Sequence, residues 1–203
     1  MVFGFKYKGI SCEDIYYNFA LKVGNTNFTI MRKLKLDELG RASVDEFRNM
    51  RKNPIVIVLD NVRSAHNVGS VFRTADAFAI EKIYLCGITA TPPHREINKT
   101  ALGSTEAVEW EHADSTEAAI RKLQALNYEI AALEQADLSV SLDQFEANPN
   151  QKYALVFGNE VYGVEDNVVK AADHVVEIPQ YGTKHSLNVS VSVGIALWHF
   201  IHR

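Results

Sequence analysis

The sequence predicts a single α/β domain built around a parallel β-sheet. Short apolar runs alternate regularly with helical patterns over most of the 203 residues. Four of the six runs are nearly unbroken hydrophobic stretches, which is typical of parallel strands covered on both faces. With 47% hydrophobic residues, a chain of this length can bury one such core.

The strands are expected at the apolar runs, with right-handed crossovers between them. The expected strands are residues 55–60, 82–86, 107–110, 128–134, 153–157 and 174–178. Between two of them, apolar side chains after Asn67 recur at i, i+3, i+4 and i+7, which predicts an amphipathic helix. Asp114 with Glu117, and Ser43 with Glu46, have the spacing of capping boxes at two further helix starts.

The C-terminal segment fits two different elements. Val189, Val191 and Val193 alternate with serines, as in a half-buried strand. The apolar residues from 189 to 200 also fit one face of a helix that follows Ser186. Local rules leave both elements open.

The composition argues against a secreted protein and against a membrane protein. Two cysteines, Cys12 and Cys86, show no paired spacing, and no apolar run approaches the roughly 20 residues of a membrane span. There is also no signal-like apolar segment. We therefore expect a soluble, cytoplasmic protein. We expect no metal site, because His199 and His202 have no cysteine or carboxylate partner in their pattern.

Charge is distributed unevenly along the chain. The net charge is −4, but residues 1–52 carry +4 and residues 53–203 carry −8. We interpret residues 31–53 as a basic helical arm and residues 1–30 as an extension of uncertain structure outside the main fold. The simpler alternative for the basic run is a solvated helix face.

The loop after the first strand is a candidate site. Residues 59–78 read LDNVRSAHNVGSVFRTADAF, a strand end followed by a polar loop and a helix. Ligands of parallel α/β proteins collect at the carboxyl ends of the strands, so this loop is well placed to bind one. Its polar residues are Asn61, Arg63, His66 and Asn67. The alternative is that Asn67 caps the helix and Arg73 is an exposed helix residue.

A second candidate loop follows the strand expected at 153–157. Gly158 and Gly163 flank Asn159 and Glu160, and glycines at such a place let the backbone approach a ligand closely. The loop lacks the Lys-Ser/Thr ending of a phosphate loop, and the chain has no G-x-G-x-x-G motif. These absences argue against a nucleotide-binding enzyme of the Rossmann type.

Three motifs, taken in order, resemble one known family. They are N-x5-R at 67–73, G-N-E-x-x-G at 158–163 and I-P-x-x-G-x-x-x-S-L-N-V-S-x-x-x-G at 178–194. Together they resemble the SpoU (TrmH) branch of the SPOUT RNA methyltransferases. The resemblance runs over residues 54–203, which we take as the methyltransferase domain.

The resemblance implies a fold that local rules do not propose. In this family a deep trefoil knot forms at the C-terminus, and the segment that matches residues 186–200 is a helix. Apolar residues surround much of this helix here, so we expect it to be buried on several sides, against the knot and a second subunit. These residues include Ile195, Leu197, Trp198 and Phe200. We therefore expect a homodimer.

The resemblance also implies a reaction, in which S-adenosylmethionine donates a methyl group to a ribose 2′-hydroxyl of tRNA or rRNA. The motif positions give the expected catalytic residues, Asn67, Arg73, Glu160, Ser186 and Asn188. The residues expected to surround the cofactor are Leu133, Gly158, Ile178 and Leu187. The residues expected to contact RNA are Arg48, Arg51, Lys52, Arg63, His66 and Arg95.

Two points stay open at this level. Arg73 is either the base that removes the hydroxyl proton or a clamp on the RNA phosphate that stabilises the developing alkoxide, because a guanidinium keeps its proton near neutral pH. The chain is either an active enzyme or a catalytically silent RNA-binding protein of the same fold. The intact motif residues favour the enzyme.

Overall fold

The computed structural model describes residues 32–40 and 42–202. Its contacts divide the chain into two compact units, Met1–Arg41 and Ala42–Arg203. The extension predicted over residues 1–30 lies outside the described residues.

The basic segment predicted as one arm is shared between the two units. In the first unit, the 3-10 helix η1 (Leu36–Leu39) lies next to an ion pair of 2.7 Å between Arg32 and Glu38. In the second unit, α2 (Val44–Asn49) begins with the capping box predicted for Ser43 and Glu46. The α2 part of the basic segment therefore belongs to the second unit.

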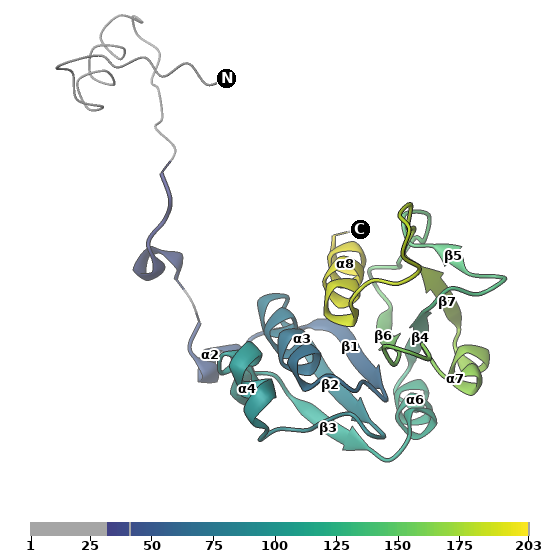
Figure 1. Cartoon of the computed structure of the whole chain (residues 1–203). Coiled ribbons are helices and arrows are strands. Elements are labelled where there is room, and N and C mark those ends of the chain that lie inside the picture. Colours follow the sequence, from purple (N-terminus) through teal and green to yellow (C-terminus); the bar gives the residue numbers. More distant parts are fainter. Residues whose placement is uncertain (1–31, 41, 203) are drawn as a thin grey trace, which may run out of the picture. The chain divides into compact units, whose positions relative to one another are not determined.

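The second unit is built on a seven-stranded sheet in the order β3-β2-β1-β6-β4-β7-β5, and each neighbouring pair is parallel (Figure 1). The parallel α/β class predicted from the apolar runs is confirmed. The strands are β1 (Asn53–Asp60), β2 (Ile80–Cys86), β3 (Trp110–Ala113), β4 (Tyr128–Leu133), β5 (Val140–Ser141), β6 (Lys152–Phe157) and β7 (His174–Glu177).

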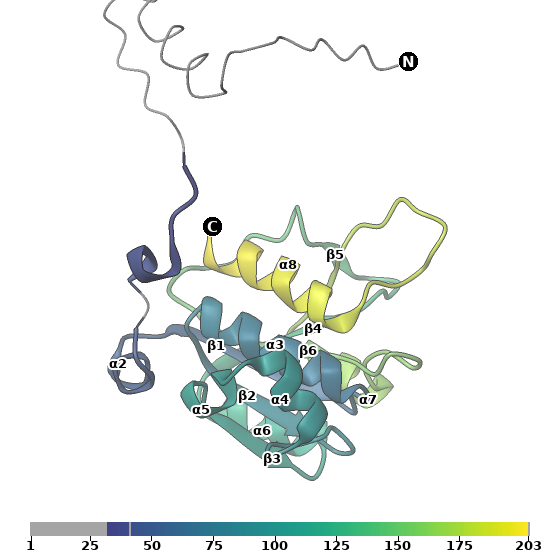
Figure 2. The same cartoon turned by 60° about the vertical axis from the view of Figure 1, so that its left-hand side comes forward.

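Helices cover both faces of this sheet (Figure 2). Side chains of successive strand residues point to opposite faces. Ile57 of β1 is therefore buried with residues of α3 and α8, and its neighbour Val58 is buried with residues of α6 and α7. No helix in the described residues is long and apolar enough to cross a bilayer. Besides α2, the helices are α3 (Ala65–Ala77), α4 (Arg95–Ala101), α5 (Ser104–Ala107), α6 (Thr116–Ala125), α7 (Asp166–Ala171) and α8 (Val189–Ile201).

Two local predictions are wrong. The run at 107–110 is not a strand, because Ala107 ends α5 and the N–H of Val108 closes its last turn on the carbonyl of Ser104. The strand β3 starts only at Trp110. The cap of α6 is not Asp114 but Ser115, whose hydroxyl accepts the N–H of Ala118 at 3.2 Å.

The C-terminal segment forms the helix that the resemblance implied, so the strand-like alternation of its valines was misleading. Helix α8 packs beside α3 over β6 (Figure 2). Leu197 and Phe200 are buried in the core of the domain, whereas Ile195 is 38% exposed and Trp198 is 61% exposed. The domain thus covers part of the apolar surface of α8 and leaves another part to solvent.

Candidate active site

The start of α3 is held by a carboxylate from a distant loop. Strands β1 and β6 are neighbours in the sheet, so the loops after their carboxyl ends meet. Glu160, in the loop after β6, accepts hydrogen bonds from the backbone N–H groups of Arg63 (2.9 Å) and Ser64 (3.0 Å). It also accepts the side-chain amide of Asn67 at 3.0 Å. Three predicted site residues, Asn67, Arg63 and Glu160, therefore come together.

These contacts keep Glu160 ionised. Partial burial opposes its charge, but the hydrogen bonds from the Arg63 and Ser64 backbone and from Asn67 outweigh this effect and hold the pKa of Glu160 below its usual value. A carboxylate that is ionised and already accepts several hydrogen bonds is a poor proton acceptor. The geometry therefore suits Glu160 to positioning Asn67 and the loop, not to acid–base chemistry.

Asn67 connects this loop to the C-terminal helix. Ser64 caps α3 by accepting the N–H of Asn67, so the alternative in which Asn67 is the cap is wrong. The side-chain carbonyl oxygen of Asn67 instead accepts a hydrogen bond from the side-chain amide of Asn188 at 3.1 Å. Asn188 in turn caps α8 by accepting the N–H of Ser190 at 2.9 Å. The hydrogen-bonded chain Glu160–Asn67–Asn188 thus joins the three motifs.

The glycines of the loop after β6 are required by its close folding. Asn159 pairs with Gly163 in an antiparallel bridge. A Cβ added to Gly158 would lie 2.0 Å from the carbonyl carbon of Gly163. Gly163 itself has a φ of 71°, and a Cβ there would lie 2.2 Å from the carboxylate of Glu134. Side chains at either glycine would displace this loop.

A cavity of about 620 Å³ lies between this loop and the segment before α8. All four residues expected around the cofactor, Leu133, Gly158, Ile178 and Leu187, line it. Their role as cofactor ligands stays a prediction. Three of the expected catalytic residues, Glu160, Ser186 and Asn188, also line it, whereas Asn67 lies behind Asn188.

Sequence reasoning missed several residues of this cavity. Glu134 is the clearest case, because its carboxylate accepts the N–H of Val164 at 2.8 Å and of Gln135 at 2.9 Å and so ties the end of β4 to the loop after β6. None of these residues stands at a specified position of the three motifs, and it is the meeting of strand ends that brings them together. The missed residues include Glu134, Gln135, Tyr162, Glu177, Gln180 and His185.

Arg73 is separated from the other predicted catalytic residues. It lies six residues beyond Asn67 on α3, which is about 9 Å along the helix axis. Its side chain is exposed, and no polar contact joins it to another residue in the described part of the chain. One protomer alone therefore does not bring Arg73 to the Glu160–Asn67–Asn188 chain.

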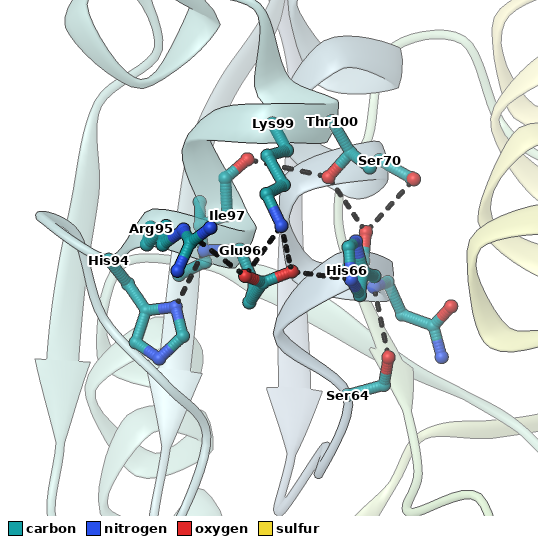
Figure 3. A network of polar contacts seen from close by, with 10 residues as sticks. Ser64, His66, Ser70, His94, Arg95, Glu96, Ile97, Lys99 and Thr100 are labelled. Atoms are coloured by element: carbon teal, nitrogen blue, oxygen red, sulfur yellow. Dashed lines mark hydrogen bonds and ion pairs between the residues drawn. The ribbon is translucent and has the colours of Figure 1, made fainter.

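Two of the predicted RNA-binding residues meet at the start of α4 (Figure 3). Glu96 lies between His66 at 2.7 Å and Lys99 at 2.8 Å, with the Nε of Arg95 at 3.9 Å. The hydrogen bond from Lys99 lowers the pKa of Glu96. Figure 3 also shows His94, whose Nδ1 accepts the N–H of Glu96 at 3.2 Å and caps α4. Several basic side chains thus lie around the carboxylate of Glu96.

Two residues of the predicted basic arm have internal partners instead. The guanidinium of Arg48 donates to the carbonyl of Glu106 at 3.1 and 2.5 Å. The ammonium of Lys52 donates to the carbonyl of Phe47, and burial lowers the pKa of Lys52. Only Arg51 of this group is exposed without such a contact in the described residues. Arg48 therefore anchors α2 to α5, and Lys52 binds back to α2 itself.

The fold and the site together define a member of a known family of methyltransferases. Residues 54–198 match the SpoU rRNA Methylase family, and the chain belongs to that family. The match includes all three motifs and most of the sheet.

The chain is similar to named methyltransferases from several bacteria. The chain is 32% identical to the tRNA (guanosine(18)-2′-O)-methyltransferase of Aquifex aeolicus, over 75% of this chain and 71% of that protein. It is 29% identical to the 23S rRNA (guanosine-2′-O-)-methyltransferase of Neisseria meningitidis, over 75% of this chain, and spans 60% of that longer protein.

Solved structures show the same fold. The crystal structure of an AdoMet-bound rRNA methyltransferase from Sinorhizobium meliloti superposes with a TM-score of 0.70 at 30% identity, covering 77% of this chain and 59% of that one. The A. aeolicus TrmH/SpoU tRNA modifying enzyme gives a TM-score of 0.68 at 28% identity, covering 77% and 78% of the two chains.

Proposed function

We propose that this protein transfers a methyl group from S-adenosylmethionine to a ribose 2′-hydroxyl of tRNA or rRNA. The observation that carries the proposal is the hydrogen-bonded chain Glu160–Asn67–Asn188, which ends at a cavity large enough for a cofactor. Membership of the family and the names of the relatives support the same reaction.

The cavity has the size and the charge that S-adenosylmethionine requires. About 620 Å³ lies within the range of small-molecule sites. Its described lining includes the carboxyl groups of Glu134, Glu160 and Glu177 but no lysine or arginine. Such a lining favours a ligand with a positive sulfonium and an ammonium group over a phosphate-bearing one. Backbone at Gly158, Ile178 and Leu187 would hold the cofactor.

In the proposed reaction, the contribution of the protein is to align the ribose hydroxyl with the methyl group of the cofactor. When bound, S-adenosylmethionine supplies a methyl group already activated by its sulfonium charge, so the reaction requires no metal. Asn67 fixes the amide of Asn188, and Ser186 lies two residues before it in the cavity wall. These polar groups would orient the ribose hydroxyl towards the methyl group, which is where most of the rate gain is expected.

Arg73 would act on the site of a partner subunit. Exposed residues of α8 form a stripe at i, i+4 and i+7, namely Val191 (49%), Ile195 (38%) and Trp198 (61%). We call this set the α8 stripe and propose that it is buried in a homodimer. Helix α3, which carries Arg73, packs beside α8, so dimerisation would bring Arg73 close to the other protomer. There its guanidinium would clamp an RNA phosphate and stabilise the alkoxide.

The family's C-terminal knot is part of the proposal. In the sheet, β6 and β4 separate β7 from β1, yet α8 packs against α3 on the β1 side. The chain after β7 must therefore cross back over the sheet, as a knotted path requires. We also propose that the protein works in the cytoplasm.

RNA would approach over the start of α4. The basic side chains around Glu96 and the exposed Arg63 lie next to the first turn of α3, which carries Asn67. Polyanions bind such clusters through their phosphates.

Incubation with S-adenosylmethionine labelled in the methyl group and with bulk RNA tests the proposed function. We expect label in RNA that survives alkaline hydrolysis within dinucleotides, because a 2′-O-methyl group blocks cleavage at that position. A silent RNA-binding protein would bind the RNA and transfer no label.

A further inference from the structure

A second cavity lies on the other side of the loop after β6. Its volume is about 450 Å³, and it shares Asn159, Tyr162 and Gly163 with the cofactor cavity. Its remaining lining residues are Asn61, Arg63, Ile88 and Glu165. A ligand here would therefore be separated from the cofactor only by the loop 159–163.

The acidic wall of this cavity is held by hydrogen bonds, although Glu165 itself is exposed. Asn61 donates its side-chain amide to Glu165 at 2.8 Å and to Asp60 at 3.0 Å, and its oxygen accepts the N–H of Ile88 at 3.2 Å. Asp60 is fully buried and also accepts the N–H of Glu165 at 2.9 Å and the hydroxyl of Thr116 at 2.6 Å. Both amide hydrogens of Asn61 and its oxygen are thus engaged, and its role is to direct Glu165.

The carboxylate of Glu165 has room for further donors. Burial and the nearby charges of Asp60 and Glu117 raise its pKa. Within the described residues, its only side-chain donor is the amide of Asn61. Because a carboxylate can accept about four hydrogen bonds, a ligand with two adjacent N–H donors would find acceptors here and would stabilise the charge.

The cavity also offers flat apolar surfaces. Tyr162 is 85% exposed and Ile88 is 68% exposed, although both line the cavity. An exposed tyrosine beside a polar wall is the arrangement with which RNA-binding proteins stack an unpaired base and read its edge.

We propose that this cavity holds the target nucleobase and that Glu165 reads it as guanine, the base named for the relatives from A. aeolicus and N. meningitidis. The inference rests on the proposed function. Among the four bases only guanine presents two adjacent donors, N1–H and N2–H2, on its Watson–Crick edge, and Glu165 accepts both. Arg63 supplies donors for O6, and Tyr162 stacks on the ring. A base in this position places its ribose at the loop that the two cavities share.

The experiment uses the full-length protein, labelled S-adenosylmethionine and bulk RNA, which is digested to nucleosides after transfer. We expect the label in 2′-O-methylguanosine. Glu165→Gln should lower kcat/KM for this product about tenfold, because a glutamine amide offers one acceptor oxygen where the carboxylate offers two. The matched control is Glu146→Gln, at an exposed carboxylate away from both cavities, which should leave the rate unchanged.

A second readout separates base recognition from a structural effect. Transcripts of one substrate RNA made with inosine in place of guanosine lack the N2 amino group. Wild type should lose about tenfold in rate on the inosine transcript, whereas Glu165→Gln should discriminate much less. If circular dichroism shows that Glu165→Gln is misfolded, Tyr162→Ala at an exposed position replaces it. Because Tyr162 also lines the cofactor cavity, its affinity for S-adenosylhomocysteine is measured on the same preparation, and a rate reduced about tenfold at unchanged affinity is expected.

The outcomes distinguish this inference from the proposed function. Absence of label in every nucleoside contradicts the proposed function and the inference with it. Label confined to 2′-O-methyladenosine, -cytidine or -uridine upholds the proposed function and overturns the guanine assignment. Label in 2′-O-methylguanosine with an equal inosine effect in wild type and Glu165→Gln overturns the role of Glu165.

Discussion

The side-chain amide of Asn67 donates to the carboxylate of Glu160 at 3.0 Å, although 93 residues separate them in the chain. The same carboxylate accepts two backbone N–H groups at the start of α3. One acidic residue therefore fixes the loop after β1 to the loop after β6 and sets the orientation of the Asn67 amide.

Glu160→Gln should loosen this junction. A glutamine retains one acceptor and directs N–H donors at the backbone N–H groups, so we expect unfolding to become easier by about 1 kcal/mol, with a larger loss of methyl transfer. Because the pKa of Glu160 is lowered in the folded state, its stabilising effect is present above the ordinary glutamate pKa and is lost as pH falls through the lower folded value. Urea unfolding of both proteins at neutral and acidic pH measures this. A stability difference that stayed constant with pH would contradict it.

Gly158→Ala should prevent cofactor binding. The added methyl group would meet the backbone of Gly163 at 2.0 Å, so the loop that lines the cavity has to move. Gly182→Ala is the matched control, since no atom lies within 4 Å of a Cβ at that position. Titration with S-adenosylhomocysteine should show at least tenfold weaker binding for Gly158→Ala and unchanged binding for Gly182→Ala. Equal affinities would remove this loop from the cofactor site.

Trp198→Glu should separate the proposed dimer. The indole is 61% exposed in one protomer, and a carboxylate in its place would be buried without a partner in the interface. Light scattering should give twice the chain mass of 22.7 kDa for wild type and a single chain mass for the variant. Leu138→Glu, at a residue that is 93% exposed outside the α8 stripe, should remain a dimer. A monomeric wild type would end the dimer proposal.

Arg73→Ala should abolish transfer while S-adenosylhomocysteine still binds, because Arg73 lies away from its own cofactor cavity. Mixing this variant with Gly158→Ala tests whether Arg73 acts across the dimer. If Arg73 acts across the dimer, each mixed dimer holds one intact site out of two. Mixed dimers make up about half of an equal mixture, so about a quarter of wild-type activity should return. No recovery after verified subunit exchange would place Arg73 in the site of its own protomer.

Arg95→Ala should weaken RNA binding and flatten its dependence on salt. The side chain is 85% exposed beside Glu96, and each lost phosphate contact lowers the log–log salt slope by about 0.7 to 0.9. Arg121→Ala, at an exposed residue of α6 on the opposite face of the sheet, is the control with an unchanged slope. The basic run at 48–52 is a poorer test, because Arg48 and Lys52 already have partners within the protein. Equal slopes for the two variants would make Arg95 a solvated surface residue.

The sequence predicted the parallel sheet correctly, because strands buried on both faces, such as residues 55–60, carry an unmistakable apolar run. The sequence-based prediction failed where the apolar pattern fits a helix and a strand equally well. Ala107 belongs to a short helix, and the valines of α8 alternate with serines as in a strand. Motif positions indicated Glu160, Asn67 and Asn188, but not that they bond to one another. Glu134 and Glu165 have no linear signal, because tertiary contacts alone bring them to the two cavities.

The most direct test of this account is the rate of methyl transfer by Asn67→Ala in a single turnover, with S-adenosylhomocysteine affinity measured on the same preparation. Asn67 fixes Asn188 from behind the cavity wall, so the account predicts an affinity close to that of wild type and transfer to the ribose 2′-hydroxyl slowed about 100-fold. Transfer at the wild-type rate, or label found on a base instead of the ribose, would contradict it.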